Sequence, residues 1–233
     1  MSVEFEVVAD PARACSALLV GAAAAGGQIV LAGGSTPRAA YLQFVDAVRD
    51  VGLDVGGATF WFGDERCVPP DDERSNYLMV KRSLLDQLGP SSQPQVRRIR
   101  GELGPVSGAD DYEQALRDAG EPQFDLVLLG IGADGHTASL FPDQPSLSER
   151  SRMVVGVAQA GLEPFVPRVT LTLPALAQGE HVVFLATGQS KADPIARAFG
   201  ADARPDPHVP SSMLAALAER TTVLLDPPAA AKL

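Results

Sequence analysis

Short apolar runs alternate along this chain with longer stretches in which apolar residues recur at helical spacing. Runs rich in β-branched or aromatic residues predict strands at Phe5–Ala9, Ile29–Leu31, Ala58–Phe62, Leu126–Leu129, Met153–Val157, Val169–Leu173, Val182–Ala186 and Thr222–Leu225. Helical spacing predicts helices near Pro11–Ala24, Pro37–Arg49, Asn76–Gln87, Gly108–Ala119, Lys191–Phe199 and Ser212–Ala218. This alternation is typical of βαβ units, so we expect an α/β fold with a mostly parallel sheet.

Residues 1–233 are expected to form a single α/β domain. The uninterrupted apolar run LVLL (Leu126–Leu129) is typical of a sheet that is covered on both faces. Gly89–Pro105 and Gly200–Pro210 are rich in Pro, Gly and polar residues and predict long loops, but neither resembles a linker between domains. A small appendage around Val154–Leu173 is compatible with this organisation.

Composition narrows the possible partners. A formal net charge of −10 disfavours nonspecific binding to nucleic acid, although a local basic pocket can still hold one small anion. The acidic start MSVEFEVVAD does not resemble a signal peptide, and the apolar stretch Ala17–Ala25 is too short to cross a bilayer. Cys15 and Cys67 lie in no metal-binding or disulfide pattern. We therefore expect a cytoplasmic monomer or weak oligomer without nucleic-acid or membrane partners.

Three strand ends carry chemistry, and the first is IVLAGGSTP (Ile29–Pro37). In open parallel sheets, ligands bind beyond the carboxyl ends of the strands. Gly33 and Gly34 let the backbone approach a ligand, and we expect Thr36 to cap a helix that begins at Pro37. The hydroxyl groups and free N–H groups at such a helix start favour an anion. The alternative is a tight turn with a capped helix and no ligand.

The second strand end is TFWFGDERCVP (Thr59–Pro69), in which an aromatic strand breaks into Asp64, Glu65 and Arg66. Arg66 offers a forked cation to a phosphate or a carboxylate. Asn76, at the start of the next predicted helix, could face the same cleft. The alternative is a solvated loop with a local Asp–Arg pair.

The third strand end follows LLGIG and places Asp134 two residues before His136. An imidazole is the natural proton acceptor at neutral pH, and a nearby carboxylate can orient it or hold a substrate hydroxyl. The chain contains no GxSxG elbow and no HxH or HExxH spacing. These residues favour acid–base chemistry without a metal or cofactor, on a small phosphorylated or carboxylated substrate.

Taken together, the three strand ends resemble those of the 6-phosphogluconolactonases, within the wider group that includes glucosamine-6-phosphate deaminases and similar sugar-phosphate isomerases. The segments that carry this resemblance are LAGGSTPRAAY (Leu31–Tyr41), WFGDERCVPPDDERSNY (Trp61–Tyr77), LGIGADGHTASLFP (Leu129–Pro142), PRVTLTLPAL (Pro167–Leu176) and TGQSKA (Thr187–Ala192). The occurrence of all five segments in this order is more specific for the resemblance than any single segment. The resemblance implies a Rossmann-like three-layer sandwich and hydrolysis of 6-phospho-D-glucono-1,5-lactone, in the oxidative branch of the pentose phosphate pathway.

The resemblance also implies roles for individual residues. His136 would be the general base, Asp134 would orient it or the substrate, and Arg66 would help to hold the polarised substrate. The residues implied in substrate or phosphate binding are Gly33, Gly34, Ser35, Thr36, Asp64, Asn76, Arg168 and Lys191. A lactone is already a reactive ester, so these groups can suffice without a covalent nucleophile or a metal ion.

Two alternatives belong to other functional classes. The deaminases continue as DGHIAFNEP, with a Glu five residues after the His, where this chain has Phe141, and they carry MDEY in place of GDER. Phe cannot titrate, so both differences favour a lactonase. The other alternative is a noncatalytic sugar-phosphate sensor, which would need a DNA-binding segment for which this acidic chain offers no room.

Overall fold

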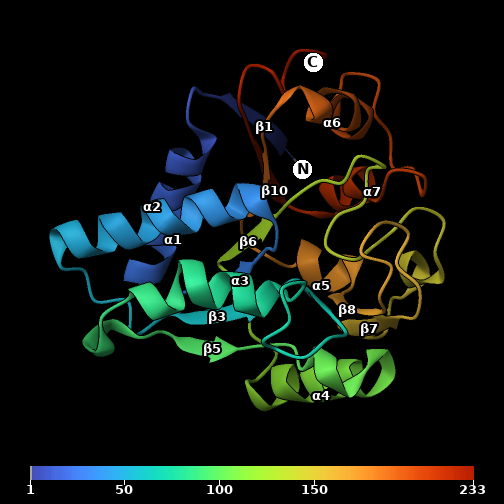
Figure 1. Ribbon diagram of the computed structural model, residues 1–233. Coiled ribbons are helices and arrows are strands. Elements are labelled where there is room, and N and C mark those ends of the chain that lie inside the picture. Colours follow the sequence, from blue (N-terminus) through green and yellow to red (C-terminus); the bar gives the residue numbers. More distant parts are fainter. Residues whose placement is uncertain (1) are drawn as a thin grey trace.

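The main sheet of the computed structural model, which describes residues 2–233, has seven strands (Figure 1). Across the sheet they are β1 (Ser2–Val7), β10 (Arg220–Leu225), β9 (Val182–Ala186), β6 (Leu126–Leu129), β2 (Gln28–Leu31), β3 (Thr59–Phe62) and β5 (Gln95–Arg97). Every neighbouring pair in this sheet is parallel. The predicted mostly parallel sheet is thus confirmed.

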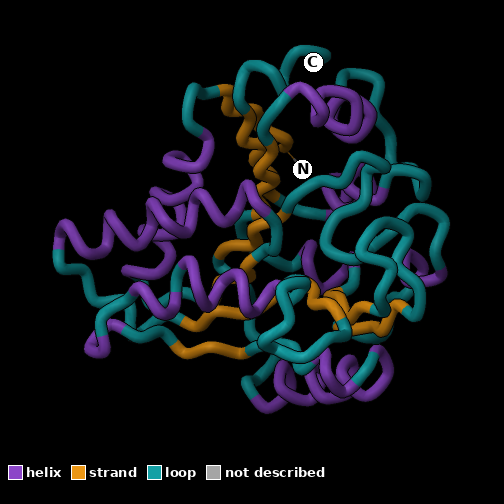
Figure 2. The backbone as a smooth tube through the Cα atoms, viewed as in Figure 1, coloured by secondary structure: helices purple, strands orange, loops and turns teal. Residues whose placement is uncertain are grey.

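Helices cover both faces of this sheet (Figure 2). On one side lie α1 (Pro11–Ala24), α2 (Ser35–Val51) and α3 (Asn76–Ser83), and on the other lie α4 (Pro105–Asp118), α5 (Leu173–Ala177), α6 (Ala192–Phe199) and α7 (Pro210–Leu217). Central strands such as β6 and β9 are therefore buried along their whole length. Their uniformly apolar sequences follow from this burial on both faces.

A second, three-stranded antiparallel sheet is formed by β4 (Asp64–Arg66), β8 (Arg168–Leu171) and β7 (Val154–Val157). Helix α4 packs against β7 and β8. This sheet accounts for the appendage expected around Val154–Leu173. The sequence did not predict β4, because three consecutive charged residues form a strand here only through pairing with β8.

Several predicted boundaries were wrong because tertiary contacts decide them. The first strand starts earlier than Phe5, since β1 pairs with β10 from Ser2 to Val7. The expected loop Gly89–Pro105 contains strand β5, which pairs with β3. The predicted strand Val169–Leu173 ends at Leu171.

Helix ends also differ from the predictions. Thr172 terminates the preceding strand because its hydroxyl caps α5, accepting a hydrogen bond from Ala175 N at 3.4 Å. The helix expected over Asn76–Gln87 ends at Ser83 and is followed by a single 3-10 turn. Thr36 is not the cap of α2, because the cap residue is Gly34, whose φ of 106° a side chain would disfavour.

The order of the strands creates one crevice in the main sheet. Strand β2 lies beside β6, but the chain leaves β2 towards β3 on one side and leaves β6 towards β9 on the other. Ligands bind at such a switch point, beyond the carboxyl ends of the strands. Within residues 2–233, no helix is both long and apolar enough to cross a membrane.

Candidate active site

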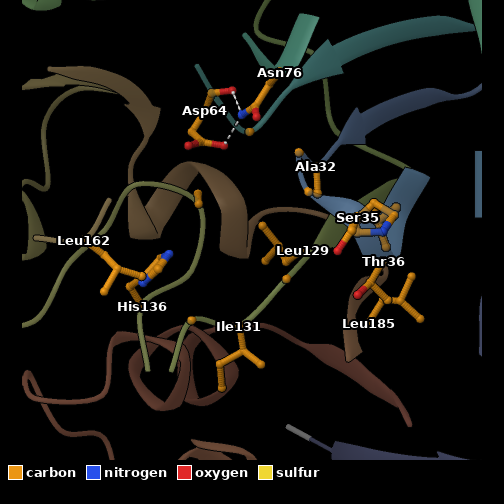
Figure 3. Close-up of a pocket in the computed structure, with 18 of the residues that line it drawn as sticks. Ala32, Ser35, Thr36, Asp64, Asn76, Leu129, Ile131, His136, Leu162 and Leu185 are labelled. Carbon is orange, nitrogen blue, oxygen red and sulfur yellow. Dashed lines mark hydrogen bonds between the residues drawn. The ribbon is translucent and has the colours of Figure 1, made fainter. Parts of the chain in front are cut away.

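A cavity of about 360 Å³ opens at the switch point between β2 and β6. All the predicted site residues except Asp134 line it: Gly33, Gly34, Ser35, Thr36, Asp64, Arg66, Asn76, His136, Arg168 and Lys191. Figure 3 shows His136 on one side of the cavity and Ser35 and Thr36 on the other. Asp134 joins the site through its contact with His136.

His136 and Asp134 form a hydrogen-bonded pair. His136 Nδ1 lies 2.6 Å from Asp134 Oδ1, and the same oxygen accepts a hydrogen bond from His136 N at 3.1 Å. Burial alone raises the pKa of Asp134, but the hydrogen bond and charge of His136 outweigh it, so this pKa lies below its usual value. An ionised Asp134 is suited to accept a hydrogen bond from Nδ1–H, and in that tautomer Nε2 carries the free lone pair.

The β2–α2 junction offers backbone donors to an anion. Gly34 provides no side-chain cap for α2, so the first N–H groups of this helix stay available at the cavity wall. Tyr41 fixes the approach to this junction, because its hydroxyl donates to Ala32 O at 2.7 Å and accepts from Ala32 N at 2.9 Å. A Cβ atom at Gly33 would lie 1.9 Å from Asn76 Oδ1, so only glycine fits beside that amide.

The charged triplet of β4 splits between two environments. Successive side chains of a strand point to opposite faces, so Asp64 and Arg66 line the cavity whereas Glu65 does not. Glu65 is 3% exposed, and its carboxylate accepts hydrogen bonds at 2.7–2.9 Å from three backbone N–H groups and from the Ser75 hydroxyl. Glu65 therefore anchors the start of α3, a role that the sequence did not separate from those of its neighbours.

We expect Glu65→Ala to lower the free energy of unfolding by about 2 kcal/mol, because it leaves several buried donors without an acceptor. Urea unfolding followed by circular dichroism measures this change. Glu73→Ala is the matched control, since the Glu73 side chain is 77% exposed and pairs only with Arg82 at the surface. Equal stabilities of the two variants would contradict the anchoring role.

Asp64 is a buried carboxylate with neutral partners. Its Oδ1 accepts from Asn76 Nδ2 at 3.0 Å and its Oδ2 from Ser139 Oγ at 2.5 Å. The local Asp64–Arg66 pair considered as an alternative is absent from the ion pairs of the described residues. Ser139 was not predicted as part of this site, and only its place in the motif that follows His136 could have suggested it.

Arg66 and Arg168 face each other across β4 and β8 and form a positive wall. Arg66 donates to Arg74 O at 2.6 Å, and its buried Nε has no hydrogen-bond partner among the described residues. Arg168 is 4% exposed, and among the described residues its side chain donates only to the carbonyl oxygens of Pro164 and Val166. Burial and then the charge of Arg66 lower the pKa of Arg168. Two neighbouring guanidinium groups that form no ion pair within the described part of the chain favour an anionic ligand.

Lys191 is the third cation of the cavity. Its Nζ donates to Ile131 O at 2.6 Å, at the carboxyl end of β6. Burial lowers the pKa of Lys191, and the charge of Asp134 offsets part of that effect. His208, whose role the sequence left open, lies outside the cavity, where its exposed ring contacts Asp143 at 2.8 Å.

Most of the chain matches one known protein family. Residues 6–223 match the family described as glucosamine-6-phosphate isomerases/6-phosphogluconolactonase. This chain belongs to that family.

Within residues 2–233, no group of three or more His, Cys, Asp or Glu side chains is arranged to hold a metal ion.

Among the members of this family, human 6-phosphogluconolactonase is 41% identical over 167 residues, which cover 70% of this chain and 64% of the human protein. The match to the 6-phosphogluconolactonase of Mycobacterium tuberculosis is 38% identical and covers 92% of this chain and 89% of that protein. This chain thus spans less than two thirds of the length of the human relative, but most of the length of the mycobacterial relative.

Solved structures extend the comparison over the whole fold. The 6-phosphogluconolactonase of Trypanosoma brucei superimposes with a TM-score of 0.81 and 29% identity, covering 100% of this chain and 99% of that chain. A monomeric glucosamine-6-phosphate deaminase superimposes with a TM-score of 0.84 at 18% identity over all of both chains. Since a lactonase and a deaminase fit almost equally well, the fold of this family does not separate the two activities, and the site residues must.

Proposed function

We propose that this protein hydrolyses 6-phospho-D-glucono-1,5-lactone to 6-phospho-D-gluconate without a metal ion. The observation that carries the proposal is the 2.6 Å contact of Asp134 with His136 Nδ1, at the edge of a cavity with three cations. A base and a positively charged wall are the groups that attack of water on an ester requires. The human and mycobacterial relatives described above are 6-phosphogluconolactonases, which supports the same reaction.

In this proposal His136 Nε2 accepts a proton from water while the water oxygen bonds to the lactone carbonyl carbon. The ring C–O bond then breaks, and His136 Nε2 returns its proton to the leaving ring oxygen, which yields the open-chain acid and restores the neutral imidazole. Asp134 holds the imidazole in the tautomer that this step needs and stabilises its charged form. Arg66 stabilises the negative charge that develops on the carbonyl oxygen.

The phosphate group would bind at the start of α2, where the backbone of Gly34–Thr36 offers donors, with Lys191 and Arg168 as cationic partners. Asp64 is a poor neighbour for a phosphate, because both are anions. Its carboxylate, held by Asn76 and Ser139, is better suited to accept hydrogen bonds from sugar hydroxyls.

Phe141 supports the lactonase over the deaminase. Its ring centroid lies 4.8 Å from that of His136, at the position where the deaminases carry a Glu. An isomerisation with deamination needs a titratable group to manage ring opening, and a phenyl ring cannot supply one. The base of this site therefore has no second acid beside it on that face.

One assay tests the proposal. Freshly generated 6-phosphogluconolactone and glucosamine 6-phosphate are offered separately to the protein, each with and without a chelator such as EDTA. We expect rapid hydrolysis of the lactone in both conditions and no release of ammonia from the amino sugar. Ammonia release, or loss of lactone hydrolysis in the chelator, would contradict the proposal.

Binding of the product should weaken at alkaline pH because of Lys191. Its pKa is lowered, so its cation is lost at a lower pH than that of an ordinary lysine, and a phosphate ligand then loses this partner. We expect the dissociation constant of 6-phosphogluconate, measured by calorimetry, to rise with pH on the alkaline side of neutrality. Lys191→Arg should remove this rise, because arginine stays charged throughout the range. The same rise in the Arg variant would exclude Lys191 as its cause.

A further inference from the structure

His136 is held on more sides than its contact with Asp134 alone provides. A Cβ atom at Gly132 would lie 2.0 Å from His136 Nδ1, so the backbone there packs directly against the imidazole. On another side the ring of Phe141 approaches it, with the two ring planes inclined by 43°. His136 Nε2 makes no hydrogen bond to the residues that the structure describes.

A tight turn brings Phe141 back to the base. Leu140 N donates to Thr137 O at 2.9 Å, and Ala138 adopts a φ of 47° within this turn. Thr137 Oγ1 ties the turn to β6 by donating to Gly130 O at 2.9 Å. The chain therefore reverses its direction directly after His136. This reversal brings Phe141 into contact with the imidazole ring of His136.

Phe141 is also tightly packed on the side that faces away from His136. It is 2% exposed and forms a small apolar cluster with Val157 and Ala160, separate from the main core. A Cβ atom at Gly161 would lie 3.1 Å from the Phe141 ring, so the loop after β7 closes tightly over its other side. Leu162, the next residue of that loop, lies beside His136 at the cavity (Figure 3).

We propose that Phe141 is a positioning residue for His136. Its ring, clamped between the imidazole and the loop after β7, keeps Nδ1 on Asp134 and Nε2 directed at the cavity. Its apolar surface also excludes water from that side of the base. The catalytic part of this inference rests on the proposed function, whereas the positioning of the imidazole does not.

The test compares Phe141→Leu with Val157→Ala. The first variant keeps an apolar side chain but removes the ring, and the second loosens the same cluster while leaving the ring in place. Because misplacement of a catalytic group by about 1 Å can cost about 10²-fold, we expect Phe141→Leu to lower kcat for the lactone by roughly 10- to 100-fold with little change in KM. Val157→Ala should lower the melting temperature with little change in kcat.

A second readout does not depend on turnover. Long-range ¹H–¹⁵N spectra report which imidazole nitrogen carries the proton, and we expect a single tautomer for His136 in the wild type and in Val157→Ala. Phe141→Leu should give an averaged pattern. A wild-type tautomer and kcat in Phe141→Leu, or an equal loss of kcat in Val157→Ala, would overturn the positioning role. An inactive wild type with the expected spectra would instead refute the proposed reaction and leave the positioning role standing.

Discussion

Replacement of His136 by alanine is expected to lower kcat for lactone hydrolysis by about 10²–10⁴-fold, the usual contribution of a general base. The KM should change little, because Ser35 and Thr36, at the proposed phosphate site, lie across the cavity from His136 (Figure 3). Stopped assays with freshly generated lactone, corrected for spontaneous hydrolysis, measure both constants. In the proposed mechanism the base is needed only as water attacks, so its loss would affect the transition state more than the bound substrate.

His208→Ala is the matched control for this experiment. His208 also contacts an aspartate through Nδ1, but its side chain is 69% exposed and lies outside the cavity. We expect this variant to retain wild-type kcat and KM. If His136→Ala turned over the lactone at a near-normal rate, His136 would have no part in the mechanism.

Replacement of Arg168 by alanine is expected to raise the KM by about 10- to 100-fold, since a hydrogen bond to a charged group contributes about 1.5–3 kcal/mol. The kcat should fall less, because the proposed contact with the phosphate would be the same in the ground state and in the transition state. The buried guanidinium forms no ion pair among the described residues, and the charge of Arg66 beside it adds to the attraction for an anionic substrate. Initial rates over a range of lactone concentrations separate the two constants.

Two further variants sharpen the test of Arg168. Arg168→Lys keeps the charge but loses the planar fork, so its KM should lie between those of the wild type and the alanine variant. Arg82→Ala removes an exposed arginine that pairs with Glu73 and should leave both constants unchanged. A large fall in kcat with an unchanged KM in Arg168→Ala would show that this cation acts on the transition state instead.

Local sequence predicted the bounds of three elements to the residue. The bounds of β6, β9 and α1 agree with the predictions, because apolar runs and a Pro start define them without distant partners. The clustering of the candidate site residues also followed from sequence, since parallel strands bring their carboxyl ends to one edge of a sheet.

The errors lie where a distant partner decides the structure. Strands β4 and β5 form against β8 and β3, and nothing within their own residues predicts a strand. The separation of Glu65 from its two charged neighbours follows from strand alternation, but only once β4 is known. The contact between Phe141 and His136 depends in the same way on the tight turn from Thr137 to Leu140, which contains no glycine or proline that would predict it.

The pairing of β1 with β10 has a consequence for synthesis of the protein. Ser2 lies opposite Arg220 and Val7 opposite Leu225, so the first strand has no partner until the residues of the tenth have left the ribosome. At roughly 5–20 residues per second, a delay of about 10–40 s separates the two events. During that interval Val3, Phe5 and Val7, which stay partly exposed even in the folded protein, belong to an unpaired strand. Closure of this edge therefore has to wait for synthesis of β10, and until then the nascent chain is open to aggregation or chaperone binding at β1.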